Sequence, residues 1–284
     1  MASFTNQAHL SYNGRSVASN VVTGQMLSPL TLTKTAVVDT YAPTDTVTYV
    51  ITIVNSGATA YTDLTLTDDL GAYAAGGQTV YPLSYTPDSA VWFINGTRQA
   101  DPTASGAPLV ISGLSVPAGG NAVILYEAAT TDAAPLAEGC EITNAVTLTG
   151  SGIGTPLTAQ ATVTVEAQAN LRITKSLSPA VVAENGSLTY TFLIQNEGNL
   201  PAGADAAVVV TDTFDPILRD LTVTLNGEPL AVKTGYTYDE STGAFATVAG
   251  QITVPAATFS QSTETGDWET VPGEAVLTVT GTVG

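Results

Sequence analysis

The chain has 284 residues, 44% of them hydrophobic, so it is long enough and apolar enough for two domains with packed cores. Its net charge of −18, with only seven lysines and arginines, argues against nucleic-acid binding, because phosphates would be repelled. One cysteine, Cys140, and one histidine, His9, exclude an intrachain disulfide and argue against a Cys/His zinc site or a Ser-His-Asp triad. We expect no cofactor, no metal and no small-molecule substrate.

Residues 1–27 predict two short strands, FTNQAHLSY and SVASNVVTG, around a turn at Asn13-Gly14. A lone hairpin is not stable in water, so this arm needs a surface to pack on. One face of the first strand predicts burial, because apolar residues alternate along it. That face carries Phe4, Asn6, Ala8, Leu10 and Tyr12.

An internal repeat follows the arm. LTLTKTAVVDTYAPTDTVTYVITIVNSG begins at Leu30, and LRITKSLSPAVVAENGSLTYTFLIQNEG begins at Leu171, a constant offset of 141 residues. Each copy has alternating apolar and polar runs separated by Gly, Pro, Asn and Asp, which is typical of antiparallel β-sandwiches. We therefore predict an all-β fold with two tandem Ig-like sandwiches, domain one at 28–168 and domain two at 169–284.

The second copy is predicted to be incomplete. Domain one continues with a final hairpin at 141–167, EITNAVTLTGSGIGTPLTAQATVTVEA, whereas domain two reaches Gly284 just after VLTVTG. The arm supplies a matching sequence, since FTNQAHLSYNGR aligns with ITNAVTLTGSGI and Asn6 falls on Asn144. A sandwich without its last strands exposes an unpaired edge and an open core, which donation of a strand from another chain repairs.

Head-to-tail donation is a heterologous contact, which gives a ring or an open filament. Within a chain, the last hairpin of domain one leads into domain two. Between chains, the donated arm would lead into domain one of its own chain in the same way, which favours a linear fibre of identical subunits. The alternative is a flexible arm beside a smaller, complete second domain.

Three polar side chains in each copy share the strand phase of core residues. In domain one they are Lys34, Asp68 and Asn144, and in domain two Lys175 and Asp212, with Asn6 supplied by another subunit. A buried ammonium is costly unless paired. One interpretation is a hydrogen-bonded cluster. The other is a Lys–Asn isopeptide bond, with Asp68 and Asp212 as catalytic acid/base groups.

The TK, TVTY…NSG, TD and TN strands resemble tandem repeat domains of unknown function in large bacterial surface proteins. The Lys/Asp/Asn set also resembles that of self-crosslinking sandwich domains in Gram-positive adhesins and pilins. This resemblance implies crosslinks within Lys34, Asp68, Asn144 and within Lys175, Asp212, Asn6. A cell-wall sorting motif is absent from the C-terminus, which departs from sortase-anchored pilins.

We therefore expect a structural subunit of an extracellular filament, at a cell or spore surface, that polymerises with identical subunits by donation of its arm. No separate enzymatic activity is expected beyond formation of its own crosslinks. The rival hypothesis is an adhesin that binds a host or matrix ligand through loops such as residues 71–90.

Overall fold

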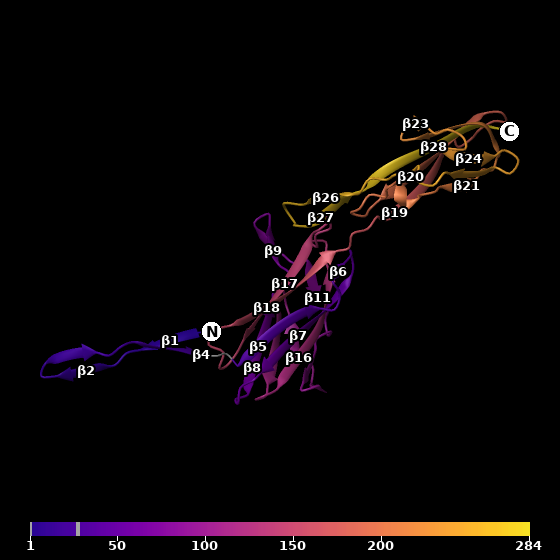
Figure 1. The fold of residues 1–284 in the computed structure, drawn as a ribbon. Helices are drawn as coiled ribbons and strands as arrows, with labels where there is room; N and C mark the ends of the chain where they lie inside the picture. The colour runs from indigo at the N-terminus through magenta and orange to yellow at the C-terminus, as the bar shows by residue number, and fades with distance from the viewer. Residues whose placement is uncertain (1, 27–28) are drawn as a thin grey trace.

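The protein is almost entirely β-structure in the computed structural model, which describes residues 2–26 and 29–284 (Figure 1). Nearly all strand pairs are antiparallel; β6 pairs in parallel with β18. The predicted all-β class with tandem Ig-like antiparallel sandwiches is confirmed. Within the described residues, no helix is long and apolar enough to cross a membrane. The predicted boundary between arm and domain one, at residues 27 and 28, lies outside the described residues, as does residue 1.

The arm is a long two-stranded ribbon. Its strands are β1 (Ala2–Asn6), β2 (His9–Tyr12), β3 (Arg15–Ala18) and β4 (Val22–Met26). β1 pairs with β4 and β2 with β3, and positive φ angles at Asn13 and Gly14 make the tight turn between them. The predicted continuous strand is interrupted at Gln7 and Ala8. Figure 1 shows the ribbon projecting away from the rest of the molecule, so its apolar residues lie in solvent in this chain.

The first sandwich consists of two large sheets and two short hairpin strands. Its strands are β5 (Leu30–Ala36), β6 (Thr40–Tyr41), β7 (Thr46–Asn55), β8 (Tyr61–Asp68), β9 (Tyr73–Ala75), β10 (Gln78–Val80), β11 (Leu83–Tyr85), β12 (Val91–Ile94), β13 (Thr97–Arg98), β14 (Thr103–Ser105), β15 (Leu109–Val116), β16 (Asn121–Thr130), β17 (Glu141–Thr149) and β18 (Leu157–Val165). One sheet has the order β13-β12-β16-β7-β5, with β11 also on β16, and the other has the order β14-β15-β8-β17-β18-β6.

Alternation of apolar and polar residues explains why these strands close a core. In β7, for example, every second residue from Val47 to Ile53 is fully buried. The NSG corner after β7 is fixed by Asn55, whose Nδ2 donates to the carbonyls of Thr59 and Pro117 and whose Oδ1 accepts from Gly57 N. Asn196 makes the same set of contacts after β20 (Ser187–Asn196), so the repeat extends to hydrogen bonds.

The second sandwich has its own hydrophobic core, separate from the first. Its strands are β19 (Leu171–Ser178), β20, β21 (Thr211–Thr213), β22 (Leu218–Leu225), β23 (Glu228–Pro229), β24 (Tyr236–Asp239), β25 (Ala244–Thr247), β26 (Thr258–Gln261), β27 (Trp268–Val271) and β28 (Gly273–Val283). A short 3-10 helix spans Ala204–Ala206. The sheets have the orders β19-β20-β28-β22-β23 and β21-β25-β24, and β26 pairs with β27 in a separate hairpin.

Candidate functional site

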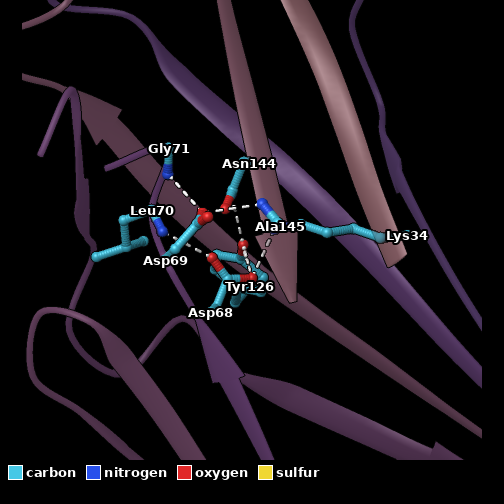
Figure 2. Close-up of polar contacts among 8 residues, drawn as sticks. All are labelled: Lys34, Asp68, Asp69, Leu70, Gly71, Tyr126, Asn144 and Ala145. Carbon is cyan, nitrogen blue, oxygen red and sulfur yellow. Dashed lines mark hydrogen bonds and ion pairs between the residues drawn. The ribbon is translucent and has the colours of Figure 1, made fainter. Parts of the chain in front are cut away.

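The first sandwich brings Lys34, Asp68 and Asn144 together inside its core. Lys34 lies on β5, Asp68 at the end of β8 and Asn144 on β17, each in the inward phase of its strand. Lys34 Nζ lies 2.6 Å from Asp68 Oδ2, and both side chains are 0% exposed. Figure 2 shows Lys34, Asp68 and Asn144 gathered around one point. This is a buried ion pair with a carboxamide beside it.

Two tyrosines that sequence reasoning missed complete this cluster. The hydroxyl of Tyr126 donates to Asp68 Oδ2 at 2.7 Å and accepts from Asn144 Nδ2 at 3.0 Å, so it bridges the carboxylate and the carboxamide. The ring of Tyr49 lies 4.7 Å from Lys34 Nζ and stacks on Tyr126. The alternation of residues along the strand could have indicated that Tyr126 faces the core, because Tyr126 alternates with the buried residues Ile124 and Ala128.

Burial sets the protonation chemistry of the cluster. Removal from water lowers the pKa of Lys34 to about 8, even though Asp68 opposes this shift. The same burial raises the pKa of Tyr126 and of Tyr49 far above the usual range, so both phenols stay protonated. A neutral Lys34 amine, which is the nucleophilic form, is therefore accessible near neutral pH.

Asp69 holds the strand that carries Asn144. Its Oδ1 accepts from Gly71 N at 2.9 Å and from Ala145 N at 2.8 Å, which fixes β17 at the end of β8. Asp68 Oδ1 meanwhile accepts from Leu70 N at 3.1 Å. Asn144 Oδ1 is buried and has no hydrogen-bond donor among the described residues. The Tyr49 hydroxyl is likewise buried without a partner among the described residues. A buried polar atom without a partner costs about 1–3 kcal/mol, so these two atoms are the unusual features of the cluster.

The second sandwich holds only two members of the equivalent set. Lys175 Nζ lies 2.5 Å from Asp212 Oδ2, but these side chains are 40% and 18% exposed. The ammonium lies 4.3 Å from the ring centroid of Tyr190, the counterpart of Tyr49. Val279 pairs with Tyr190 as Tyr126 pairs with Tyr49, so the bridging phenol is absent there.

Asn6, the predicted third member, lies on the arm and is exposed. The structure does not bring it to Lys175 and Asp212 within one chain, since the arm projects away from the second sandwich (Figure 1). The other residues of the predicted donor face, Phe4, Ala8, Leu10 and Tyr12, are also exposed.

The two sandwiches differ at one edge. In the first, β8 lies between β15 and β17, whereas β21 in the second pairs with β25 alone in the described part of the chain. The first strands differ as well. Leu30 on β5, which packs against β18, is 4% exposed, and its counterpart Leu171 on β19 is 38% exposed. Every residue of β19 is exposed, so the second sandwich is open along the side that β17 and β18 close in the first.

Comparison with known proteins gives resemblances of fold. No family model matches the chain, and no curated protein matches it. Solved structures that resemble it include pilin backbone subunits and a collagen adhesin from Gram-positive bacteria. BcpA, the major pilin subunit of Bacillus cereus, is 10% identical with a TM-score of 0.35 over 95% of this chain and 73% of that one.

The pilus 2b backbone protein of group B streptococcus is 14% identical with a TM-score of 0.34, over 58% of this chain and 76% of that one. The collagen adhesin of S. aureus is 13% identical with a TM-score of 0.32 over 55% of each chain, so this chain spans about half the adhesin's length. It also spans 27% of a family 123 glycoside hydrolase from Clostridium perfringens. Because these scores are low, we base the proposals below on this chain's own residues.

Proposed function

We propose that this protein is the structural subunit of an extracellular filament, in which the arm of one subunit completes the second sandwich of its neighbour. The open side of the second sandwich carries this proposal. There β21 has an unpaired edge and β19 exposes Leu171, Ile173 and Leu177, whereas the first sandwich covers the same positions with β17 and β18. An exposed apolar sheet edge is an aggregation hazard unless a specific strand covers it.

The arm fits this opening in sequence and in form. It is a hairpin, as β17 and β18 are, and its exposed apolar residues lack a partner within the described chain. In the first sandwich Val146 pairs with Asp68 and Leu148 with Leu66. If Asn6 takes the place of Asn144, the same register sets Ala8 opposite Asp212 and Leu10 opposite Val210. Asn6 then enters the core next to Lys175.

Burial of Lys175 and Asp212 by the arm would remove this pair from water, as Lys34 and Asp68 are in the first sandwich, although no phenol replaces Tyr126 there. The proposed reaction begins with transfer of a proton from the lysine to the aspartate, which leaves a neutral amine. The amine attacks the Asn carboxamide carbon and forms a new C–N bond. The aspartic acid protonates the Asn nitrogen, whose bond to that carbon breaks so that ammonia leaves, and the resulting aspartate takes the surplus proton from the attacking nitrogen.

Deletion of residues 1–26 tests the assembly. The shortened subunit should not polymerise, and a peptide of residues 1–27 should bind it and protect β19 and β21 from hydrogen exchange. The full chain should form fibres visible by electron microscopy. Fibres from the shortened subunit, or protection of a surface outside β19 and β21, would contradict donation by the arm.

Peptide mapping of assembled protein tests the crosslinks separately. The expected products are a Lys175–Asn6 peptide between subunits and a Lys34–Asn144 peptide within one, each lighter by one ammonia. Asn6→Ala should remove only the first product, with Gln7→Ala as the matched control. An assembly of full mass that dissolves to monomers in hot detergent would leave donation intact and remove the crosslink proposal.

A surface location at a cell or spore is part of this proposal, because a homopolymer of acidic subunits suits an external appendage. The rival adhesin hypothesis used the loop at 71–90. Its first part, β9 and β10, contacts the second sandwich through Tyr73 and Gln78. That placement favours a structural role for this segment.

A further inference from the structure

Two hairpins that the internal repeat does not share meet between the sandwiches. Between Leu70 and β11, the first sandwich inserts residues 71–82 with β9 and β10, where the second has only 215–217. Between β25 and β28, the second sandwich inserts β26 and β27, where the first passes from β15 to β16 through 117–120. Figure 1 shows the β26–β27 hairpin reaching back toward β9.

Tyr73 is the centre of the contact between these hairpins. Its hydroxyl accepts from Gln261 Nε2 at 2.5 Å and from Trp268 Nε1 at 3.3 Å, and donates to Ala133 O at 2.7 Å. Two further bonds cross the joint, from Trp268 N to Asp132 O and from Gln78 Nε2 to Glu264 O. These bonds come from both hairpins and from the first sandwich, so they fix an orientation as well as a distance.

The hairpins approach so closely that only glycine fits at two positions. A Cβ on Gly76 would lie 1.8 Å from the carbonyl oxygen of Thr263, and a Cβ on Gly266 would lie 2.4 Å from Val80 Cγ1. Gly77, the next residue in the same turn, also has a positive φ but nothing within 4 Å of its Cβ position. Glycine at 76 thus serves the contact as well as the turn.

A third contact at this joint is also absent from the repeat. Asn199 donates from Nδ2 to Leu136 O and Glu166 O, and its Oδ1 accepts from Gln168 N. The residue 141 positions earlier is Ala58, which can make none of these bonds. In a fibre, the second sandwich of one subunit precedes the first sandwich of the next. At this joint between subunits, the second sandwich lacks a counterpart of β9 and β10. The first sandwich that follows it lacks counterparts of β26, β27 and Asn199.

We propose that the β9–β10 and β26–β27 hairpins form a latch that holds the two sandwiches of one subunit in a fixed orientation, and that the joint between subunits lacks a latch. A fibre of this protein is then a chain of stiff two-sandwich rods that bends once per subunit, at the joint between subunits. This proposal differs from the expectation from sequence that the joint within the chain imitates the joint between chains. The statement about fibres rests on the proposed function, whereas the latch does not.

Spin labels on the two sandwiches test the latch in the full chain. With Cys140→Ser throughout, labels at Thr97→Cys and Glu228→Cys occupy exposed positions, and dilution into unlabelled protein restricts the signal to one subunit whether or not fibres form. Pulsed dipolar spectroscopy should give a narrow distance distribution for the parent and for Gly77→Ala. Gly76→Ala should broaden it several-fold. Equal widths for Gly76→Ala and Gly77→Ala, or a broad parent distribution, would overturn the latch.

Thermal unfolding of both glycine variants separates a broken latch from a damaged sandwich, because Gly76→Ala should unfold within a few degrees of Gly77→Ala. A second readout concerns the fibre. Electron micrographs of the parent should show bends spaced by one subunit length, and Gly76→Ala should add bends within subunits. Parent bends at both joints alike would overturn the alternating stiffness. Absence of fibres would count against the proposed function, while the distance distributions would still decide the latch.

Discussion

The register of the donated arm can be tested with one leucine. Leu10 is 65% exposed in the free subunit, so Leu10→Ala should change the stability of that subunit by no more than about 0.5 kcal/mol. Its counterpart in the first sandwich, Leu148, is fully buried. If Leu10 takes that environment in the neighbour, truncation removes a buried isobutyl group and costs about 2–5 kcal/mol of binding. The dissociation constant should rise about 30-fold to several thousand-fold.

Calorimetry with the subunit lacking residues 1–26 and synthetic arm peptides measures this directly. All three peptides, the parent, Leu10→Ala and His9→Ala, also carry Asn6→Ala, so that no covalent bond disturbs the equilibrium. The matched control is His9→Ala, because His9 corresponds to the half-buried Thr147 on the opposite face and should lose much less affinity. A Leu10→Ala peptide that binds as tightly as the parent, with His9→Ala weakened, would refute the register and put the other face of the arm in the core.

Three further predictions concern the first sandwich. The pKa of a free Lys34 amine is about 8 in the folded protein and 10.5 in the reference state, so the unfolded chain binds more protons between these values. In protein whose intact mass shows no loss of ammonia, stability should therefore rise by about 1–2 kcal/mol from pH 8 to about 9.5, and Lys34→Met should flatten the slope. Urea unfolding followed by Trp92 fluorescence in a Trp268→Phe background measures this, and a flat profile in uncrosslinked protein would contradict the lowered pKa. Tyr126→Phe should lower the free energy of unfolding by about 1–3 kcal/mol, measured the same way. Tyr49→Phe should change it little, since the Tyr49 hydroxyl makes no hydrogen bond to described residues. Equal effects of the two substitutions would contradict the bridging role of Tyr126. Asn55→Ala should cost about 2–3 kcal/mol, because the buried Asn55 side chain makes three hydrogen bonds that would be lost. This loss should exceed that of the exposed Ser56→Ala, and a smaller loss would show that the corner relaxes.

Strand phase was the part of the sequence that carried most structural information. It places Lys34, Asp68 and Asn144 inward on three strands because side chains alternate across a sheet, and the structure has all three in the core of the first sandwich. Strand phase also predicts that Tyr126 is buried, but a tyrosine among apolar residues does not indicate that its hydroxyl makes polar contacts in the core. Its bridge between Asp68 and Asn144 depends on the register of β16 against β7, which local sequence does not determine.

The latch was beyond prediction from the repeat for a related reason. A repeat shows what two copies share, whereas Tyr73 and Gln261 lie in the segments that the copies do not share. Neither segment has a strong pattern, since β9 and β10 are three residues each and β26 and β27 four each. Their pairing is a tertiary contact between residues 188 apart in the chain.

Under the proposed function, the difference between the two sandwiches explains how one chain contains a domain that completes itself and a domain that is completed by a neighbour. In the first sandwich, β17 follows within the same chain, so Asn144 reaches Lys34 and Asp68 as the domain folds. In the second, the side chains of Lys175 and Asp212 are 40% and 18% exposed, so this ion pair stays partly hydrated until a strand excludes water. Arrival of the arm would then supply the carboxamide and the burial in one step. Crosslinking would therefore follow docking in the correct register, and a misregistered arm, which leaves Lys175 hydrated, would dissociate.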